Sequence, residues 1–175
     1  MLISKNEIRR RAIAFSKEWE NETSEDSEAK SFWDGFFNVF GVSRRRVGSF
    51  EYNVKKIDGS NGFIDVLWKG VMLAEHKSRG RDLDKAYAQA KDYFPGLKDE
   101  ELPRYIVVSD FEKFRLYDLD KNETHDFLLS NLSDNINLFN FLSGYSAVES
   151  YVQEEIASRK AAELLAEFHN EIEKT

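Results

Sequence analysis

The chain has 175 residues, with 25 Lys and Arg against 32 Asp and Glu, and a net charge of −7. This length predicts one domain, with or without an appendage, that buries a hydrophobic core without disulfides. The net negative charge argues against a protein that binds nucleic acid over its whole surface, so any contact with nucleic acid has to be local. The absence of cysteine excludes thiol catalysis and cysteine-ligated zinc and favours a reducing compartment. Because the sequence has neither a signal peptide nor a long apolar run, we expect a cytoplasmic protein that does not associate with a membrane.

Two amphipathic helices are predicted at the start of the chain. Ser4 and Glu7 have the spacing of a capping box, which opens a helix that runs to about residue 21. A polar loop over 21–27 precedes a second helix over about 28–40, which ends at Gly41. The second helix carries an aromatic stripe at helical spacing. We interpret this stripe as core and not as a cofactor site, and it consists of Phe32, Trp33, Phe36, Phe37 and Phe40.

Three strands are predicted next. Apolar and polar residues alternate over 47–57, and a loop over 58–62 connects this strand to a second one over 63–68 as a hairpin. A short turn at Lys69 and Gly70 then leads to a third strand. The run FIDVLWKGVMLAEHK, residues 63–77, therefore predicts a β-hairpin in the middle of a sheet.

Three charged residues interrupt this apolar hairpin: Asp65, Glu75 and Lys77. Within strands this apolar, they have to face something that offsets their desolvation, such as a cation or each other. Side chains alternate along a strand, so Glu75 and Lys77 point one way and His76 points the other. A two-residue turn would separate Asp65 from Glu75, whereas a three-residue loop would bring them together. Gly70 suits the left-handed position of the longer loop, so we predict that both carboxylates and the ammonium share one side.

A polar loop over 78–81 and a third helix over about 82–94 are predicted after the hairpin, and Pro95 ends the helix. Gln89 and Tyr93 are four residues apart and therefore share one face of this helix.

Two further strands are predicted over 104–109 and 114–117. A helical crossover makes the first of them parallel to the strand before the helix, so we predict an α/β fold, a mixed sheet with helices on its faces. Residues 121–135 are polar and we expect them to be mobile, residues 136–142 should form a short helix, and residues 147–174 one long helix. The long helix has a narrow apolar seam that needs a partner, formed by Ala161, Leu165, Phe168 and Ile172.

The charged hairpin carries a resemblance to a known superfamily. Asp65, followed by Glu75-His76-Lys77 on the next strand, resembles the PD-(D/E)XK nucleases, although Ile64 stands where their name has Pro. More narrowly, the runs FIDVLWKGVMLAEHKSRGRDLDKAYAQA and YIVVSDFEKFRLYDL are similar to the amino-terminal endonuclease domain of MmeI-like type IIG/IIL restriction-modification enzymes. The resemblance implies a restriction-endonuclease-like mixed β-sheet flanked by helices. It also implies a nuclease core over 1–120 and, over 121–175, a helical extension that leads towards a spacer or partner.

This resemblance implies a DNA endonuclease that depends on Mg²⁺, with Mn²⁺ as a substitute. Asp65, Glu75 and the backbone carbonyl of His76 would be the metal ligands, which suits the preference of Mg²⁺ for oxygen. Lys77 would orient the attacking water and help to stabilise the charge on the phosphate.

The resemblance also implies supporting residues. Gln89 and Tyr93 match the QxxxY element of some branches of the superfamily, and Ser78 follows the lysine directly. Arg79 and Arg81 are the expected contacts to DNA phosphates. For each of these residues, the alternative is that it is simply a surface or core residue. Tyr93 in particular is of a type that is common in protein cores.

The expected partners are double-stranded DNA and the other domains of a restriction-modification enzyme. Pro95 and Pro103 are the two prolines of the chain, so an Asn-Pro-Pro-Tyr methyltransferase motif is absent. We therefore expect the methyltransferase and target-recognition domains elsewhere in a longer chain or in a separate subunit, and S-adenosylmethionine to be bound only there. A transient dimer on DNA is expected as well, because cutting both strands usually requires two nuclease domains.

Three alternatives remain open from the sequence. The first is a RecB-like repair nuclease, which shares the site but acts on DNA ends. The second is a catalytically inactive scaffold, or an interaction module built round the final helix. In the third, Lys77 forms a structural ion pair with Glu75 or Asp65, which leaves one of the three charged groups without a role.

Overall fold

The computed structural model describes residues 3–43, 48–56, 58–143, 159–162 and 165. It begins with two helices, α1 (Lys5–Trp19) and α2 (Glu25–Val39). The Ser4 side chain accepts a hydrogen bond of 3.2 Å from the N–H of Glu7, which confirms the predicted start of α1. The second helix starts earlier than the predicted residue 28, and this difference matters for the site described below.

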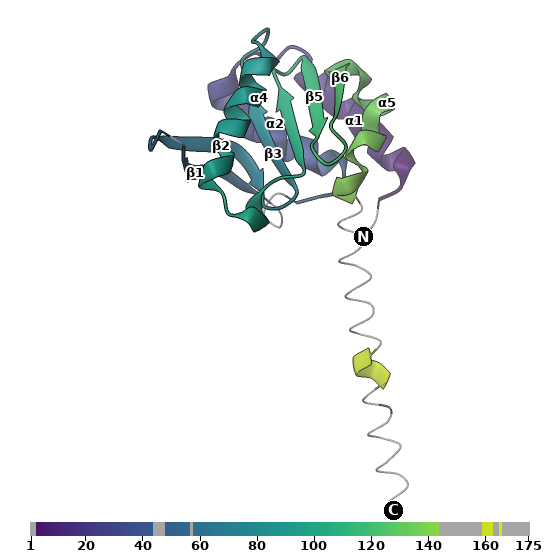
Figure 1. Cartoon of the computed structure of the whole chain (residues 1–175). Coiled ribbons are helices and arrows are strands. Elements are labelled where there is room, and N and C mark those ends of the chain that lie inside the picture. The colour runs from purple at the N-terminus through teal and green to yellow at the C-terminus, as the bar shows by residue number, and fades with distance from the viewer. Residues whose placement is uncertain (1–2, 44–47, 57, 144–158, 163–164, 166–175) are drawn as a thin grey trace, which may run out of the picture.

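The elements after α2 form a six-stranded sheet in which the spatial order of the strands equals their chain order (Figure 1). All neighbouring strands are antiparallel except the third and fourth, which are parallel and are connected through a helix. The predicted mixed sheet is therefore confirmed. Its members are β1 (Ser49–Lys55), β2 (Asn61–Trp68), β3 (Met72–His76), β4 (Tyr105–Ser109), β5 (Lys113–Asp118) and β6 (Glu123–Leu128), and the crossover helix is α4 (Leu83–Asp92).

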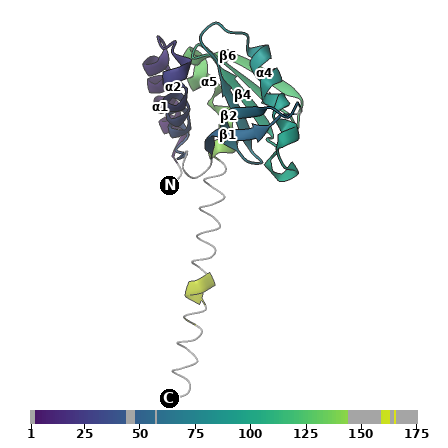
Figure 2. The same cartoon turned by 90° about the vertical axis from the view of Figure 1, so that its left-hand side faces the viewer.

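Helices cover both faces of the sheet. Figure 2 shows α1 and α2 together on one side and α4 on the other. The aromatic stripe of α2 is buried against the first face, as predicted, and the small residues Ala86 and Ala90 let α4 pack closely on the second. Short helical segments complete the fold: η1 (Phe94–Gly96), η2 (Asp99–Glu101), η3 (Leu129–Asn131), α5 (Leu132–Asn135) and η4 (Ile136–Phe139).

The segment expected to be mobile, 121–135, contains regular secondary structure that the sequence did not predict. It contains β6, one of the two edge strands of the sheet, whose Phe127 stacks on Phe114 of β5 with ring centroids 5.4 Å apart. Residues 136–142 are helical, as predicted. The core includes side chains as far as Leu142, while a functional boundary at residue 120 stays a prediction.

Most of the long helix predicted over 147–174 lies outside the described residues. Its described residues, 159–162 and 165, are helical, and Leu165 of the apolar seam is 70% exposed. In the described part of the chain, no helix is long and apolar enough to cross a bilayer.

Gly96, in η1 just after α4, offers a test of how closely this segment packs on the sheet. A Cβ atom at this position would lie 2.1 Å from the carbonyl oxygen of Lys55 and 2.4 Å from Cγ2 of Val54, both in β1. We expect Gly96→Ala to lower the free energy of unfolding by about 1–3 kcal/mol, measured by urea denaturation, because the backbone has to shift. Gly48→Ala is the matched control, since a Cβ there meets its nearest atom at an ordinary 3.5 Å. Equal stability of the two variants would contradict this close approach.

Candidate active site

The loop between β2 and β3 has the three-residue geometry that the sequence predicts. The last strand pair before it is Trp68 with Met72, and Gly70 adopts a φ of 71°. Strand pairing runs back from the loop to Val66 and Ala74, so the next opposing positions are those of Asp65 and Glu75.

The sheet opens at these two acidic residues. Regular pairing of β2 with β3 ends at Val66, whereas β2 stays paired with β1 as far as Asn61 and β3 stays paired with β4 as far as His76. Beyond that point, side chains replace the backbone ladder. The Asp65 carboxylate accepts a 2.7 Å hydrogen bond from the N–H of His76, and the Glu75 carboxylate accepts a 3.4 Å bond from the N–H of Asp65. Both carboxylates therefore lie where the two strands diverge.

Lys77 completes the convergence of charged groups. Its Nζ lies 3.8 Å from a carboxylate oxygen of Glu75 and 4.0 Å from one of Glu25, and its side chain is 23% exposed. The structure thus brings Asp65, Glu75 and Lys77 together at the opening, while the prediction that all three side chains lie on one side of the hairpin stays a prediction. Their chemical roles stay predictions.

Burial dominates the electrostatics of the two acids. Desolvation raises the pKa of Asp65, and it raises the pKa of Glu75 well above its ordinary value. The charge of Asp65 raises the pKa of Glu75 further, and the Lys77 ammonium opposes both shifts only in part. A second positive charge at this opening would allow both carboxyls to ionise.

The residues present fit a divalent cation. The buried carboxylate of Glu75 and the partly buried one of Asp65 are the donor type that Mg²⁺ prefers, and Asp65 lines a cavity of about 170 Å³ between α2 and β1. Within the described ranges, no three His, Asp or Glu side chains are grouped closely enough to hold a metal by themselves. A cation here would therefore need backbone carbonyl or water oxygens in addition to the two side chains.

Glu25 is a residue of this site that the sequence analysis missed. Its carboxylate accepts hydrogen bonds from the N–H and the Oγ of Ser78, at 2.6 and 2.7 Å, in addition to its approach to Lys77. Glu25 is the first residue of α2, in a stretch that we expected to be loop. A correct helix start would have marked it as an acid in the first turn, but not as a neighbour of residues 77 and 78.

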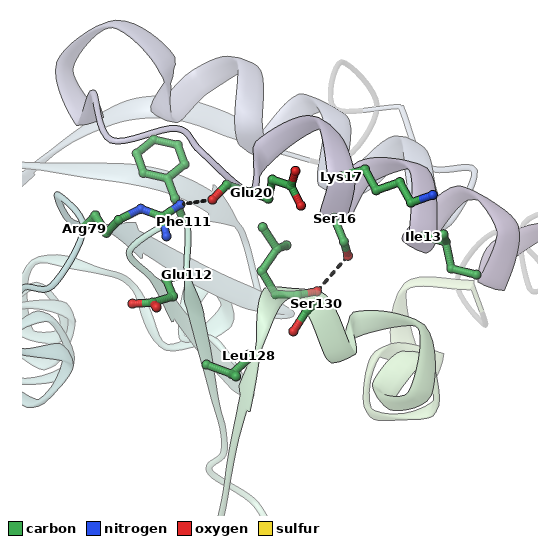
Figure 3. Close-up of a pocket in the computed structure, with 10 residues that line it drawn as sticks. Ile13, Ser16, Lys17, Glu20, Arg79, Phe111, Glu112, Leu128 and Ser130 are labelled. Carbon is green, nitrogen blue, oxygen red and sulfur yellow. Dashed lines mark hydrogen bonds between the residues drawn. The ribbon is translucent and has the colours of Figure 1, made fainter.

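The predicted phosphate contacts differ in their surroundings. The guanidinium of Arg79 donates to the carbonyl oxygen of Glu20, just beyond the end of α1, at 2.8 Å (Figure 3), and to that of Glu22 at 3.0 Å. Arg79 also lines a cavity of about 410 Å³ between α1 and the end of β6, and the three charged residues of the hairpin do not line this cavity. Arg81 is exposed on the loop that leads into α4. Contacts of either arginine to DNA stay predictions, and Arg79 already has a structural role.

Tyr93 contacts the strand of Asp65, and Gln89 contacts Tyr93. Tyr93 is 1% exposed, and its hydroxyl donates a 3.0 Å hydrogen bond to the carbonyl oxygen of Phe63. The Gln89 amide donates to the same hydroxyl at 2.6 Å. Burial, with a smaller contribution from Glu75, raises the pKa of Tyr93 to about 12, so the phenol stays protonated at neutral pH.

His76 packs on the opposite face, as predicted. Its ring lies against Phe111 and Phe32, with centroids 4.1 and 4.8 Å apart. Burial lowers the pKa of His76 to about 3, so its imidazole is neutral.

The fold and the opened hairpin define a class of protein. A mixed six-stranded sheet with helices on both faces, opened between its second and third strands, is a restriction-endonuclease-like α/β fold. The chain belongs to the family described as "MmeI, N-terminal domain", whose family model matches residues 10–175.

The fold is also found among solved structures. The chain is similar to the protein in the cryo-EM structure of a DrdV–DNA complex, with a TM-score of 0.53 and 15% sequence identity. The match covers 77% of this chain and 14% of that chain, so this chain corresponds to a small part of the other protein. No curated protein matches the chain.

Proposed function

We propose that the chain is the nuclease domain of a type II (IIG/IIL) restriction-modification enzyme and hydrolyses phosphodiester bonds of double-stranded DNA with Mg²⁺. The observation that carries the proposal is the convergence of Asp65, Glu75 and Lys77 at the opening between β2 and β3. Membership of the MmeI N-terminal domain family and the fold shared with a protein solved on DNA support it.

Each polar group has a role in this proposal. Asp65, Glu75 and the backbone carbonyl of His76 would hold Mg²⁺, which when bound supplies Lewis-acid stabilisation of the phosphate and favours ionisation of water. Lys77 orients the attacking water, and its ammonium offsets negative charge that develops on the phosphate oxygens. Glu25 restrains the backbone that follows Lys77 through its two hydrogen bonds to Ser78.

The other functions of a restriction-modification enzyme belong outside this chain in our proposal. The methyltransferase, which binds S-adenosylmethionine, and the target-recognition domain would follow in the full-length chain or lie in a separate cytoplasmic subunit. Two copies would pair transiently on DNA to cut both strands. Mg²⁺ would be the cofactor, and Mn²⁺ would be able to substitute for it.

Metal titration tests the proposal directly. We expect calorimetry with Mn²⁺ or Mg²⁺ to give saturable binding, and circular plasmid to be nicked slowly and without sequence preference, because an acidic chain of this kind lacks an obvious base-reading element. Chelation with EDTA should remove the activity. Asp120→Asn is the control, because this exposed acid pairs with Arg104, whose backbone N–H bonds to Val71 in the loop at the other end of the hairpin.

The other outcomes separate the alternatives. Cleavage of linear DNA together with an intact circular plasmid would favour the RecB-like function. The absence of both metal binding and cleavage would favour an inactive scaffold that contains a structural ion pair between Lys77 and Glu75.

A further inference from the structure

The segment of β2 that carries Asp65 has little support from the centre of the sheet. Residues 61–64 pair only with β1, which is itself an edge strand, and Asp65 has no partner in the register of either neighbouring strand. Closing the gap to β3 would add backbone hydrogen bonds, each worth about 1 kcal/mol. The separation of Asp65 from Glu75 therefore needs a contact that holds this part of β2 in place.

Tyr93, the residue that follows α4, supplies such a contact. Its hydroxyl donates to the carbonyl oxygen of Phe63, two residues before Asp65. Its ring lies so close to Gly62 that a Cβ there would be 2.5 Å from Cε1 of the ring. The ammonium of Lys56 lies 5.3 Å from the ring centroid. One buried side chain thus contacts successive residues of β2 just before the acid.

Gln89 directs the Tyr93 hydroxyl. Its amide NH₂ donates to the phenol oxygen at 2.6 Å, so the phenol proton is left to point at the Phe63 carbonyl. Chains of hydrogen bonds of this kind strengthen one another in a buried setting. The two helix residues and the strand carbonyl therefore act as one unit, here called the Gln89–Tyr93 clamp.

We propose that Gln89 and Tyr93 are positioning residues, whose clamp on β2 holds the strand away from β3 and fixes the place of Asp65 relative to Glu75. The inference rests on the proposed function, because the property that it sets is the fit of the two carboxylates to a metal ion. It also explains why the buried aromatic residue at position 93 is a tyrosine, because the clamp uses the hydroxyl of Tyr93.

Tyr93→Phe removes the hydroxyl and keeps the ring on Gly62. We expect Mn²⁺ affinity, measured by calorimetry, to fall about tenfold, the scale seen when a residue that orients a metal ligand is lost. Tyr87→Phe is the matched control: Tyr87, on α4, stacks on Tyr117 of β5 with ring centroids 3.8 Å apart, and β3 and β4 lie between β5 and β2 in the sheet. Its metal affinity should equal that of the wild type.

A second readout does not depend on metal. Hydrogen exchange of the metal-free protein should show faster exchange of the Asp65 amide in Tyr93→Phe, with the amide of Ile106 in β4 unchanged. Gly62→Ala, whose Cβ displaces the ring, should show the same local effect. Faster exchange at both amides would mean a general loss of stability and would overturn the clamp.

The two proposals fail in different ways. Wild-type protein that binds no metal would overturn the proposed nuclease, while hydrogen exchange would still decide on the clamp. Wild-type protein that binds metal, with Tyr93→Phe equal to it in affinity and exchange, would overturn the clamp alone.

Discussion

Asp65→Asn is expected to abolish divalent-cation binding and DNA cleavage while leaving the metal-free protein at least as stable as the wild type. The loss of activity follows from removing one of two carboxylates, and we expect cleavage to fall by about 10³-fold or more, since a metal supplies several kcal/mol of transition-state stabilisation. Plasmid nicking and Mn²⁺ calorimetry measure the two losses.

The retained stability follows from the surroundings of Asp65. Its partly buried carboxyl lies beside Glu75, and desolvation raises its pKa. In the absence of metal, the negative charge of Asp65 therefore destabilises the folded state. An asparagine oxygen can still accept the 2.7 Å hydrogen bond from the N–H of His76. Thermal unfolding without metal should therefore show no loss, and the stabilisation that Mn²⁺ gives the wild type should vanish.

Asp110→Asn provides the contrast of a carboxylate with a purely structural role. Asp110 is fully buried, and its two oxygens accept hydrogen bonds from the backbone N–H groups of Gly80, Glu112 and Lys113. An amide has only one oxygen to offer, so we expect this variant to lose about 1–3 kcal/mol of stability. If Asp65→Asn behaves like Asp110→Asn and metal binding is unaffected, the acids of the hairpin are structural.

The central hairpin could be predicted from the sequence because its information is local. Strand-forming residues flank a glycine whose left-handed conformation fixes the loop at three residues, and that loop alone decides that Asp65 faces Glu75. The aromatic stripe of α2 is equally local, since helical spacing places it on one face.

The edge strand β6 and the neighbours of Lys77 could not be predicted in the same way. β6 is solvated on much of its surface, so its sequence is as polar as a loop, and only its pairing with β5 makes it a strand. Glu25 meets Ser78 across 53 positions of the chain, and Tyr93 meets Phe63 across 30. The spacing of Gln89 and Tyr93 shows that they share a helix face, but only packing shows what they bind.

Lys77→Met is expected to separate metal binding from cleavage. The Lys77 ammonium lies 3.8 Å from Glu75, close enough to repel a cation held by that carboxylate. Removing this charge should leave Mn²⁺ affinity equal to or greater than that of the wild type. Cleavage should nevertheless fall by about 10²–10³-fold, the usual loss when one group that stabilises the developing charge is removed.

The control and the arginine variant locate the effect in the ammonium group. Lys69→Met removes a lysine from the loop of the same hairpin, where it pairs with Glu101, and should cleave DNA like the wild type. Lys77→Arg keeps the charge but replaces a compact ammonium with a planar fork, so it should restore only part of the activity. If Lys77→Met instead loses metal binding and stability together, then Lys77 holds Glu75 in a structural pair. That result would remove the water-orienting role on which the proposed hydrolysis depends.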